Sequence, residues 1–444
     1  MRSVALVMIS ACASPASDMR DAYVIDTLAE DNYMWALRDP DLVAMKLALM
    51  QEEPYEWLRG TAAVYWRDLA TPGVDRPVTK FGDPLSSRVL LVADPHPENI
   101  GSFRASDGTM RIDYDDFDAA GYGPFEGDVR RLAAGMIVAA AGAGPSPADI
   151  ASAVAAAYQA QIADLEAGVA PDPGTAPYLD KLIAKAQENG DAHKELADDV
   201  ASPGVLATGD LDPVDAYGVV QNRVESIGTT EHDLVTGALA PLLAAHPEVG
   251  AIEDIGRRYG HGVSSYPALR YLVLLAGVTD SPSDDRVLEI KEERDGLDIA
   301  NVPQLDSSEW SSPGQRATDA AHRLWLRPDE DVLWSHGEAT PLSFVTHDDA
   351  DYQRGVDHGD LAALAGSDAE QYLQVCGVFG RLLARAHGLA TTEDGLRGAD
   401  VIANVLGDGF ADEVAGFAPA DAAQITTDWM ALKDRDLASL VVQP

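Results

Sequence analysis

Hydrophobic side chains recur at helical spacing along much of this 444-residue chain. Between residues 20 and 70 the apolar positions stand three or four apart, as at Leu42, Met45 and Leu49, and this spacing predicts helices with one buried face. A stretch rich in Pro and Gly at 169–177 interrupts the pattern. Further helices are predicted over residues 128–141, 147–168, 178–198, 229–246, 315–325 and 361–388.

Short apolar runs bounded by turn residues predict a smaller set of β-strands. In the run that contains Lys291, alternation places the lysine on the face opposite to Leu288 and Ile290. The helices and strands together predict an α+β fold that is predominantly helical. The predicted strands cover residues 88–93, 109–114, 269–275, 286–292 and 342–346.

The composition is that of a strongly acidic globular protein. Hydrophobic residues make up 46% of the chain, and 32 Lys and Arg against 73 Asp and Glu give a net charge of −41. The acidic residues are spread along the whole sequence, which indicates a solvated surface. Such a surface repels the phosphates of nucleic acids and anionic lipids. We therefore expect no nucleic-acid partner.

The segment around residues 94–118 carries the most specific chemical pattern. Asp94 stands five residues before Asn99, and fourteen residues further on Asp113 follows an apolar residue. Kinases use this arrangement: the first Asp deprotonates the attacking hydroxyl, and the Asn and second Asp hold magnesium on the nucleotide phosphates. Amide and carboxylate oxygens are the ligands that magnesium prefers. The segment thus predicts a kinase-type site.

We therefore expect Asp94 to be the catalytic base. The expected magnesium ligands are Asn99, Asp113 and Asp115, with Asp116 and Asp118 as secondary candidates for metal or substrate. Two other interpretations stay open for the acidic run 113–118, which are a solvated loop and a calcium site.

Residues 94–99 (DPHPEN) and 111–114 (RIDY) resemble the catalytic segment of aminoglycoside-phosphotransferase-type kinases, and residues 123–132 (GPFEGDVRRL) resemble the start of the helix that follows it. A closer resemblance is to a bacterial family, domain of unknown function 2252, whose Arg-Gly helix is similar to residues 55–60 (YEWLRG). That resemblance extends over most of the chain after residue 40. It implies a two-lobed protein-kinase-like fold that uses Mg²⁺ and ATP.

Three positions depart from the motif of these relatives. Val92 stands where the kinases carry His, Ala93 replaces a Gly, and Glu98 adds a negative charge beside the expected metal. The three key side chains are unchanged. The departures nevertheless leave open a degenerate copy that has lost catalysis.

The second half of the chain carries a pattern typical of nucleotide binding. Residues 256–265 are predicted to form a glycine-bearing loop before two strands, of which the second contains Lys291. In kinases such a loop covers the phosphates, and the Lys neutralises them and pairs with a helix carboxylate. We expect Gly260, Gly262 and Lys291 to bind the nucleotide. The alternative is a solvent-facing Lys291 beside three glutamates.

A carboxylate partner for Lys291 is expected from the helix predicted at 315–325 or from the segment before it. Asp319 and Glu309 are the two candidates. Relatives tend to carry Glu at the position of Asp319, so its shorter side chain is a further departure.

The order of these parts is reversed relative to ordinary kinases, because the Asp94 segment comes first. The sequence therefore predicts a circularly permuted fold, which is acceptable where the original chain ends lie close together. The predicted parts are a signal and tether (1–17), a helical lobe with the Asp94 segment (18–246), a β-rich lobe (247–350) and a helical segment that completes the larger lobe (351–444).

The amino-terminal residues resemble a bacterial lipoprotein signal. A short apolar stretch at 3–9 leads into residues 9–12 (ISAC), which resemble a lipoprotein cleavage box. We expect Cys12 to be lipidated and the protein to lie at the cell envelope, with contact to the membrane only through that anchor; the alternative is a cytoplasmic protein. The second cysteine, Cys376, lies in an apolar helix and is expected to be buried and inert.

Two main hypotheses follow for function. The first is a phosphotransferase that uses Mg-ATP on a small-molecule or protein acceptor that the sequence does not identify. The second is a catalytically inactive kinase-like lipoprotein that acts as a binding module, since ATP is scarce outside the cytoplasm. A third is metal-assisted phosphoester chemistry on the acidic run.

Overall fold

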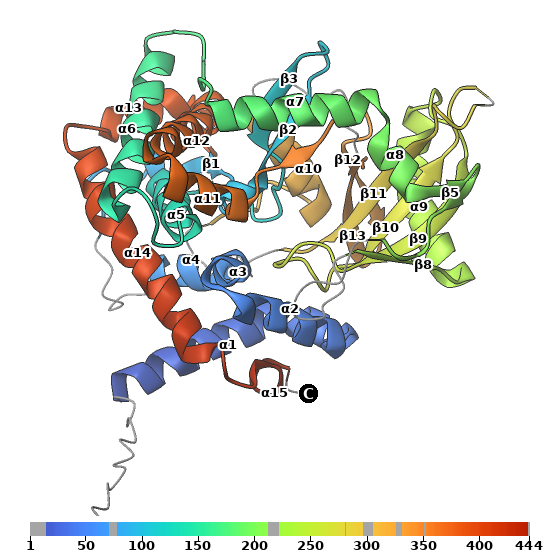
Figure 1. Ribbon diagram of the computed structural model, residues 1–444, viewed down its shortest axis with the longest axis horizontal. Helices are drawn as coiled ribbons and strands as arrows, with labels where there is room; N and C mark the ends of the chain where they lie inside the picture. The colour runs from blue at the N-terminus through green and yellow to red at the C-terminus, as the bar shows by residue number, and fades with distance from the viewer. Residues whose placement is uncertain are drawn as a thin grey trace, which may run out of the picture.

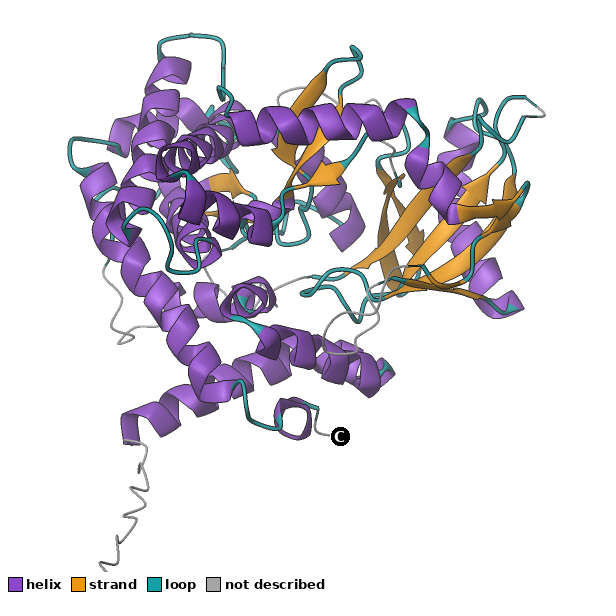
Figure 2. Ribbon diagram, viewed as in Figure 1, coloured by secondary structure: helices purple, strands orange, loops and turns teal. Residues whose placement is uncertain are grey.

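Helices and strands occupy different sides of the molecule. A computed structural model describes residues 15–70, 78–211, 222–279, 281–295, 305–325, 331–349 and 352–442. Figure 2 shows a large helical part beside an antiparallel sheet, with a few short strands inside the helical part. The α+β, predominantly helical class is therefore confirmed. Cys12 lies outside the described residues.

The helices are α1 (Pro15–Arg38), α2 (Pro40–Glu52), α3 (Pro54–Gly60), α4 (Ala62–Ala70), α5 (Phe125–Ala139), α6 (Pro147–Glu166), α7 (Pro177–Asp191), α8 (Lys194–Asp199), α9 (Thr229–Ala245), α10 (Pro313–Leu324), α11 (His358–Ser367), α12 (Ala369–Leu389), α13 (Gly398–Val405), α14 (Phe410–Leu432) and α15 (Leu437–Val441), with short 3-10 turns at Ser86–Arg88 and Pro97–Asn99. Among the described residues, no helix combines the length and the apolarity needed to cross a bilayer.

The strands are β1 (Val89–Leu91), β2 (Ile100–Arg104), β3 (Met110–Tyr114), β4 (Gly121–Gly123), β5 (Val200–Ser202), β6 (Val205–Leu206), β7 (Gly209–Asp210), β8 (Arg223–Ser226), β9 (Ile252–Tyr259), β10 (Arg270–Leu275), β11 (Arg286–Glu293), β12 (Ser335–Ala339), β13 (Leu342–Asp348) and β14 (Arg354–Gly355). All five predicted strand segments are confirmed.

Local capping chemistry sets where several helices begin. Ser146 and Ser312 each accept a hydrogen bond from a backbone N–H in the first turn of α6 and α10, and a proline follows each serine. Asp368 caps α12 in the same way, so the helix predicted over 361–388 is two helices. The helix predicted over 178–198 is also divided, because His193 adopts a left-handed φ of 50° between α7 and α8.

The helical part is built on α5, α6, α12 and α14, which pack around one core. Its centre contains fully buried side chains such as Val154, Phe379 and Leu383. Gly380 lets α12 approach α6 closely, because a Cβ there would lie 2.2 Å from the carbonyl oxygen of Val154. Helices α1 to α4 lie beneath this core, and α15 packs on α1 (Figure 1).

The large sheet has the strand order β12-β13-β11-β10-β9-β8-β7 and is antiparallel throughout. Helix α9 covers one face, where Leu288 and Ile290 of β11 join its apolar core. Val287 belongs to a separate apolar cluster on the other face. The predicted alternation along this strand is therefore confirmed, and Lys291 lies on the face away from α9.

One sequence prediction about the sheet was wrong. Residues 256–259 belong to strand β9 instead of a loop, and the turn to β10 begins at Gly260. Arg257 and Arg258 pair with residues of β8, a strand that the apolar pattern did not predict. Strand β8 and α9 thus pack with the large sheet, although their residues were assigned to the first helical segment.

Helix α7 connects the two parts of the molecule. It runs from beside α12 across the β2–β3 hairpin and leads into α8, which contacts β11 (Figure 1). The chain crosses back after β13, where β14 pairs with β2. These two connections place the Asp94 segment, the β2–β3 hairpin and strand β11 around the same central region.

Candidate active site

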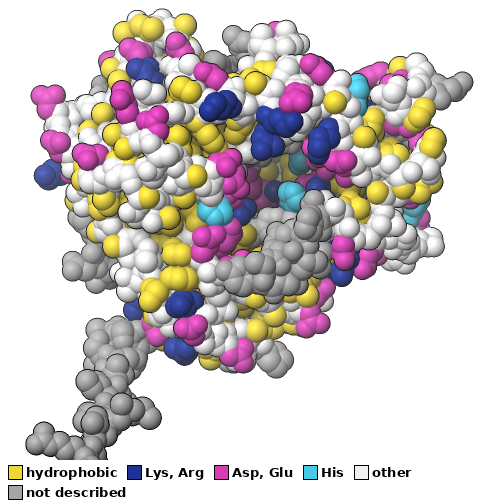
Figure 3. Space-filling model, viewed as in Figure 1, with side chains coloured by type: hydrophobic (Ala, Val, Ile, Leu, Met, Phe, Trp, Pro, Cys, Tyr) yellow, Lys and Arg dark blue, Asp and Glu magenta, His cyan; other side chains and the backbone are white. Residues whose placement is uncertain are grey.

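A cavity of about 820 Å³, counted to its open mouth, lies where the helical part meets the large sheet. Asp94 and Asn99 line it from the first segment, and Gly262 and Ser265 line it from the β9–β10 turn. Figure 3 shows acidic, basic and histidine side chains gathered around the hollow centre of this face. The structure thus brings together residues from both predicted motifs.

The backbone before Asp94 is fixed by buried hydrogen bonds. Ala93 adopts a left-handed φ of 65°, a conformation that favours glycine. Its N–H donates to Asp128 Oδ2 at 3.1 Å, and its carbonyl oxygen accepts from Trp66 Nε1 at 2.7 Å. The fully buried Asp128 also lies 3.1 Å from Nε2 of His387. Asp128 therefore fixes the backbone before Asp94 and is part of the scaffold of the site.

The carboxylate of Asp94 is held on one side by a buried arginine. Arg131 Nε donates to Asp94 Oδ1 at 2.6 Å, and its NH2 group donates to the Leu58 carbonyl oxygen at 3.0 Å. The other oxygen, Oδ2, lies 3.9 Å from His96 Nε2, beyond hydrogen-bonding distance. Burial lowers the pKa of His96 to about 4, so this imidazole is neutral near pH 7. One carboxylate oxygen of Asp94 is thus fixed and the other is left for a ligand.

The side-chain amide of Asn99 is held through its nitrogen, which leaves its oxygen available to a ligand. Its Nδ2 donates to the Asp94 carbonyl oxygen at 2.9 Å, and the residue lines the cavity. An amide whose nitrogen is engaged in this way keeps its oxygen as an acceptor. Asn99 is therefore suited to the metal-ligand role expected of it.

Asp113, in contrast, forms buried ion pairs with both of its carboxylate oxygens. It is 1% exposed, bonded to Arg385 of α12, and 3.0 Å from Arg111 NH1 through its Oδ2. Neither Asp113 nor Asp115 is among the described residues that line the cavity. Asp113, which was predicted to bind magnesium, therefore links β3 to α12 through its ion pair with Arg385.

The carboxylates that reach the cavity come after the end of β3. Asp116 and Asp118 line it, and Asp118 N donates to Asp116 Oδ1 at 3.0 Å. Burial, and then repulsion from Asp118, raises the pKa of Asp116 to about 6. Burial, and then repulsion from Asp116, raises the pKa of Asp115 to about 8. Crowded carboxylates of this kind favour a bound cation.

Lys291 reaches the same acidic residues from strand β11. Its ammonium bonds to Asp118 and lies 3.8 Å from Asp116 Oδ1 and 3.3 Å from Glu293 Oε1. Burial lowers the pKa of Lys291, but attraction to these carboxylates outweighs burial and raises the pKa above its usual value. The lysine is 7% exposed and is therefore held in the site instead of facing solvent.

The carboxylates expected to pair with Lys291 lie elsewhere. Glu309 accepts hydrogen bonds from Tyr122 and Arg323, and the described ion pairs of Lys291 do not include Asp319. Helix α10 instead places Arg316 near the site, where its NH1 group donates to the Ala120 carbonyl oxygen at 2.7 Å. The partner role falls to Asp118 and to Glu293 on the same strand as the lysine.

The glycines of the β9–β10 turn adopt left-handed backbone conformations. Gly260 and Gly262 have φ values of 75° and 73°, which residues with a side chain rarely adopt. Ser265, in the same turn, accepts a hydrogen bond from Arg270 at 3.1 Å. Gly262 and Ser265 line the cavity, whereas Gly260 stands at the end of β9.

Sequence reasoning missed two charged residues of the site. Arg131 orients Asp94 from α5, and Glu293 lies two positions after Lys291 on the same face of β11. The alternation along β11 could have identified Glu293, since alternate residues of a strand share a face. No local pattern marks Arg131, whose partner is 37 positions away.

Comparison with known proteins identifies the family of this chain. The chain belongs to the family described as "Uncharacterized protein conserved in bacteria (DUF2252)", whose sequence profile matches residues 38–435. No curated protein and no solved structure matches the chain.

Proposed function

We propose that this member of the bacterial DUF2252 family is a kinase-like phosphotransferase that uses a magnesium-bound nucleotide. The observation that carries the proposal is that Asp94, Asn99 and Asp118 line one cavity and that Lys291, 173 positions after Asp118, bonds to that aspartate. This is the set of side-chain types that kinases bring to the transferred phosphate.

In this proposal Asp94 is the base that accepts the proton of the acceptor hydroxyl. Arg131 fixes one of its oxygens, so the carboxylate is oriented without being fully paired. The neutral imidazole of His96 next to it does not add a competing positive charge. Positioning of this kind is the main requirement in phosphoryl transfer, which needs little covalent chemistry from the protein.

The proposed magnesium ligands are Asn99, Asp116 and Asp118 in place of Asp113. When bound, magnesium would neutralise charge on the nucleotide's phosphates. The donor set fits the ion, because it combines an amide oxygen with two carboxylates that line the same cavity. Kinases carry this Asp in an Asp-Phe-Gly triplet, and Asp116 likewise precedes a buried phenylalanine, Phe117.

Lys291 and the β9–β10 turn are proposed to hold the nucleotide phosphates. The turn joins two adjacent strands, Lys291 is on the third, and helix α10 follows that strand. Kinases have the same succession of glycine loop, lysine strand and helix. Asp118 neutralises the lysine, so phosphate binding would require Lys291 to exchange that partner.

A circular permutation accounts for the order of these parts. In a chain with the ordinary order, the helix equivalent to α12 would lead directly into the Asp94 segment. The two segments do meet, because the backbone N–H of Glu393, just after α12, donates to the carbonyl oxygen of Arg88, just before β1, at 3.0 Å. Joining them would therefore need only a short connection, and α7 with α8 would be the connection that moved.

Turnover of labelled nucleotide tests the proposal. Transfer to water is measured first, because water is always present as an acceptor. Asp94→Asn is expected to lower turnover by about two to four decades, the usual contribution of a general base, with nucleotide binding retained. Asp400→Asn, at an exposed position on α13, is the control. Equal turnover in wild type and Asp94→Asn would contradict the role of Asp94.

A further inference from the structure

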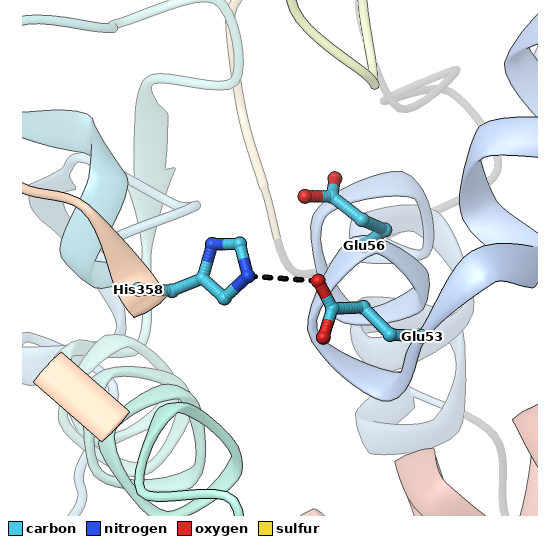
Figure 4. A group of neighbouring side chains, drawn as sticks. All are labelled: Glu53, Glu56 and His358. Atoms are coloured by element: carbon cyan, nitrogen blue, oxygen red, sulfur yellow. Dashed lines mark hydrogen bonds and ion pairs between the residues drawn. The ribbon is translucent and has the colours of Figure 1, made fainter. Parts of the chain in front are cut away.

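We propose a second metal site, separate from the cavity, in which Glu53, Glu56 and His358 bind a divalent transition-metal ion such as Zn²⁺. One side-chain donor atom from each residue lies within 4.8 Å of the other two. Figure 4 shows the two carboxylates of the α2–α3 region and the imidazole of α11 directed toward the same space. Nitrogen and carboxylate donors in this number are typical of zinc sites with an open position.

The imidazole is already oriented as metal-binding histidines usually are. His358 Nδ1 lies 2.6 Å from Glu98 Oε1, and Nε2 faces Glu53 Oε1 at 2.8 Å. A carboxylate behind one ring nitrogen fixes the tautomer that presents the other nitrogen to a metal. Tyr55 stacks on the ring with centroids 4.4 Å apart and planes inclined by 14°. Glu98 is therefore the residue that would orient the ligand.

The charges around this space favour a cation. The carboxylates of Glu53, Glu56, Glu98 and Asp357 surround His358, and the basic side chain paired with them is Arg59. Its NH1 group lies 3.1 Å from Glu56 Oε2 and 3.0 Å from Glu98 Oε2. With His358 neutral, as a ligand must be, four carboxylates against one guanidinium leave a negative excess that a divalent ion would neutralise.

A bound ion would take the place of a proton on the His358 imidazole, because a ligating imidazole must be neutral. The ion would then join the α2–α3 junction, the segment of Glu98 and the first turn of α11. Glu53 is about half exposed, which gives the ion a path from solvent.

Zinc titration of the chelator-treated full chain tests the site. Calorimetry at pH 8 is expected to show one zinc ion per chain, with affinity at least tenfold weaker in Glu53→Gln and in His358→Gln. His246→Gln is the matched control, since His246 forms an exposed pair with Glu248 at 2.9 Å. Glu53→Gln keeps the test valid if His358→Gln fails to fold, because Glu53 is half exposed.

Two further titrations assign the ion to its ligands. Asp116→Asn is expected to keep zinc binding, which separates this site from the acidic residues of the cavity and from the proposed nucleotide function. Cobalt in place of zinc should give the absorption of a coordinated ion, and this absorption should disappear in Glu53→Gln. Zinc binding of equal strength in wild type, Glu53→Gln and His358→Gln, or no binding by wild type, would overturn the proposal.

Discussion

The ammonium of Lys291 lies against the carboxylate of Asp118, which stands 173 positions earlier in the chain. Asp116 and Glu293 lie within 4 Å of the same nitrogen. The lysine therefore neutralises a buried acidic cluster before any nucleotide binds. Removing it would leave three carboxylates without their shared cation.

We predict that Lys291→Met lowers the free energy of unfolding of the magnesium-free protein by about 3–5 kcal/mol, the cost of breaking a buried ion pair. Urea denaturation measures this change. Lys433→Met is the control, because Lys433 is partly exposed and makes a 3.9 Å pair with the exposed Asp434 and a contact over the Trp429 ring, outside any buried ion cluster. An equal effect of both substitutions would contradict the buried pairing of Lys291.

Asp113 and Asp116 are predicted to respond differently to the same substitution. Asp116→Asn should abolish magnesium-dependent nucleotide binding and leave the fold intact. Asp113→Asn should lower stability, because it weakens the pairing of Asp113 with Arg385 and Arg111. Nucleotide titrations and urea denaturation of both variants measure the two effects. Loss of magnesium dependence in a folded Asp113→Asn protein would restore Asp113 as the ligand.

The raised pKa of Asp115 predicts a pH dependence of stability. The folded chain takes up this proton below a pKa of about 8, whereas the unfolded chain takes it up near 3.8. The contribution to stability is therefore complete below pH 4 and is lost as the pH rises through about 8. Asp115→Asn cannot ionise and should be more stable than wild type at pH 9, by on the order of 1 kcal/mol.

The difference in free energy of unfolding between Asp115→Asn and wild type should be smaller at pH 5.5, where the wild-type carboxyl is protonated. Magnesium-free urea denaturation at both pH values gives the comparison. A difference that does not change with pH would mean that Asp115 is not the group responsible.

Asp128→Ala is predicted to lower the free energy of unfolding by about 3–5 kcal/mol. The substitution would leave the N–H of Ala93 and the side chain of His387 without their common partner. Thermal and urea denaturation measure the loss, with Asp400→Ala as the exposed control. A change as small as that of the control would show that the Ala93 backbone does not depend on Asp128.

Periodicity predicted most helices and strands because each has one buried face, as Leu288 and Ile290 show in β11. The spacing from Asn99 to Asp113 does not show where strand β3 ends. Asp113 lies inside the strand and faces α12, whereas Asp116 lies beyond it and reaches the cavity. Residues just past a strand are common positions for functional side chains.

The partners of the site residues could not be predicted from local sequence. Asp118 meets Lys291 only when the acidic run and strand β11 come together in the folded protein. The same is true of Arg131, which reaches Asp94 from a helix packed behind it. Such contacts depend on tertiary packing, and the residue types alone do not specify them.

Calorimetric titration with ATP, with and without magnesium, tests the central claim most directly. The account predicts one nucleotide bound per chain in the presence of magnesium, with binding lost when magnesium is removed and in Asp116→Asn and Lys291→Met. The control Lys433→Met should bind like wild type. No binding by wild type with magnesium, or binding of equal strength in Asp116→Asn, would contradict a kinase-like nucleotide site.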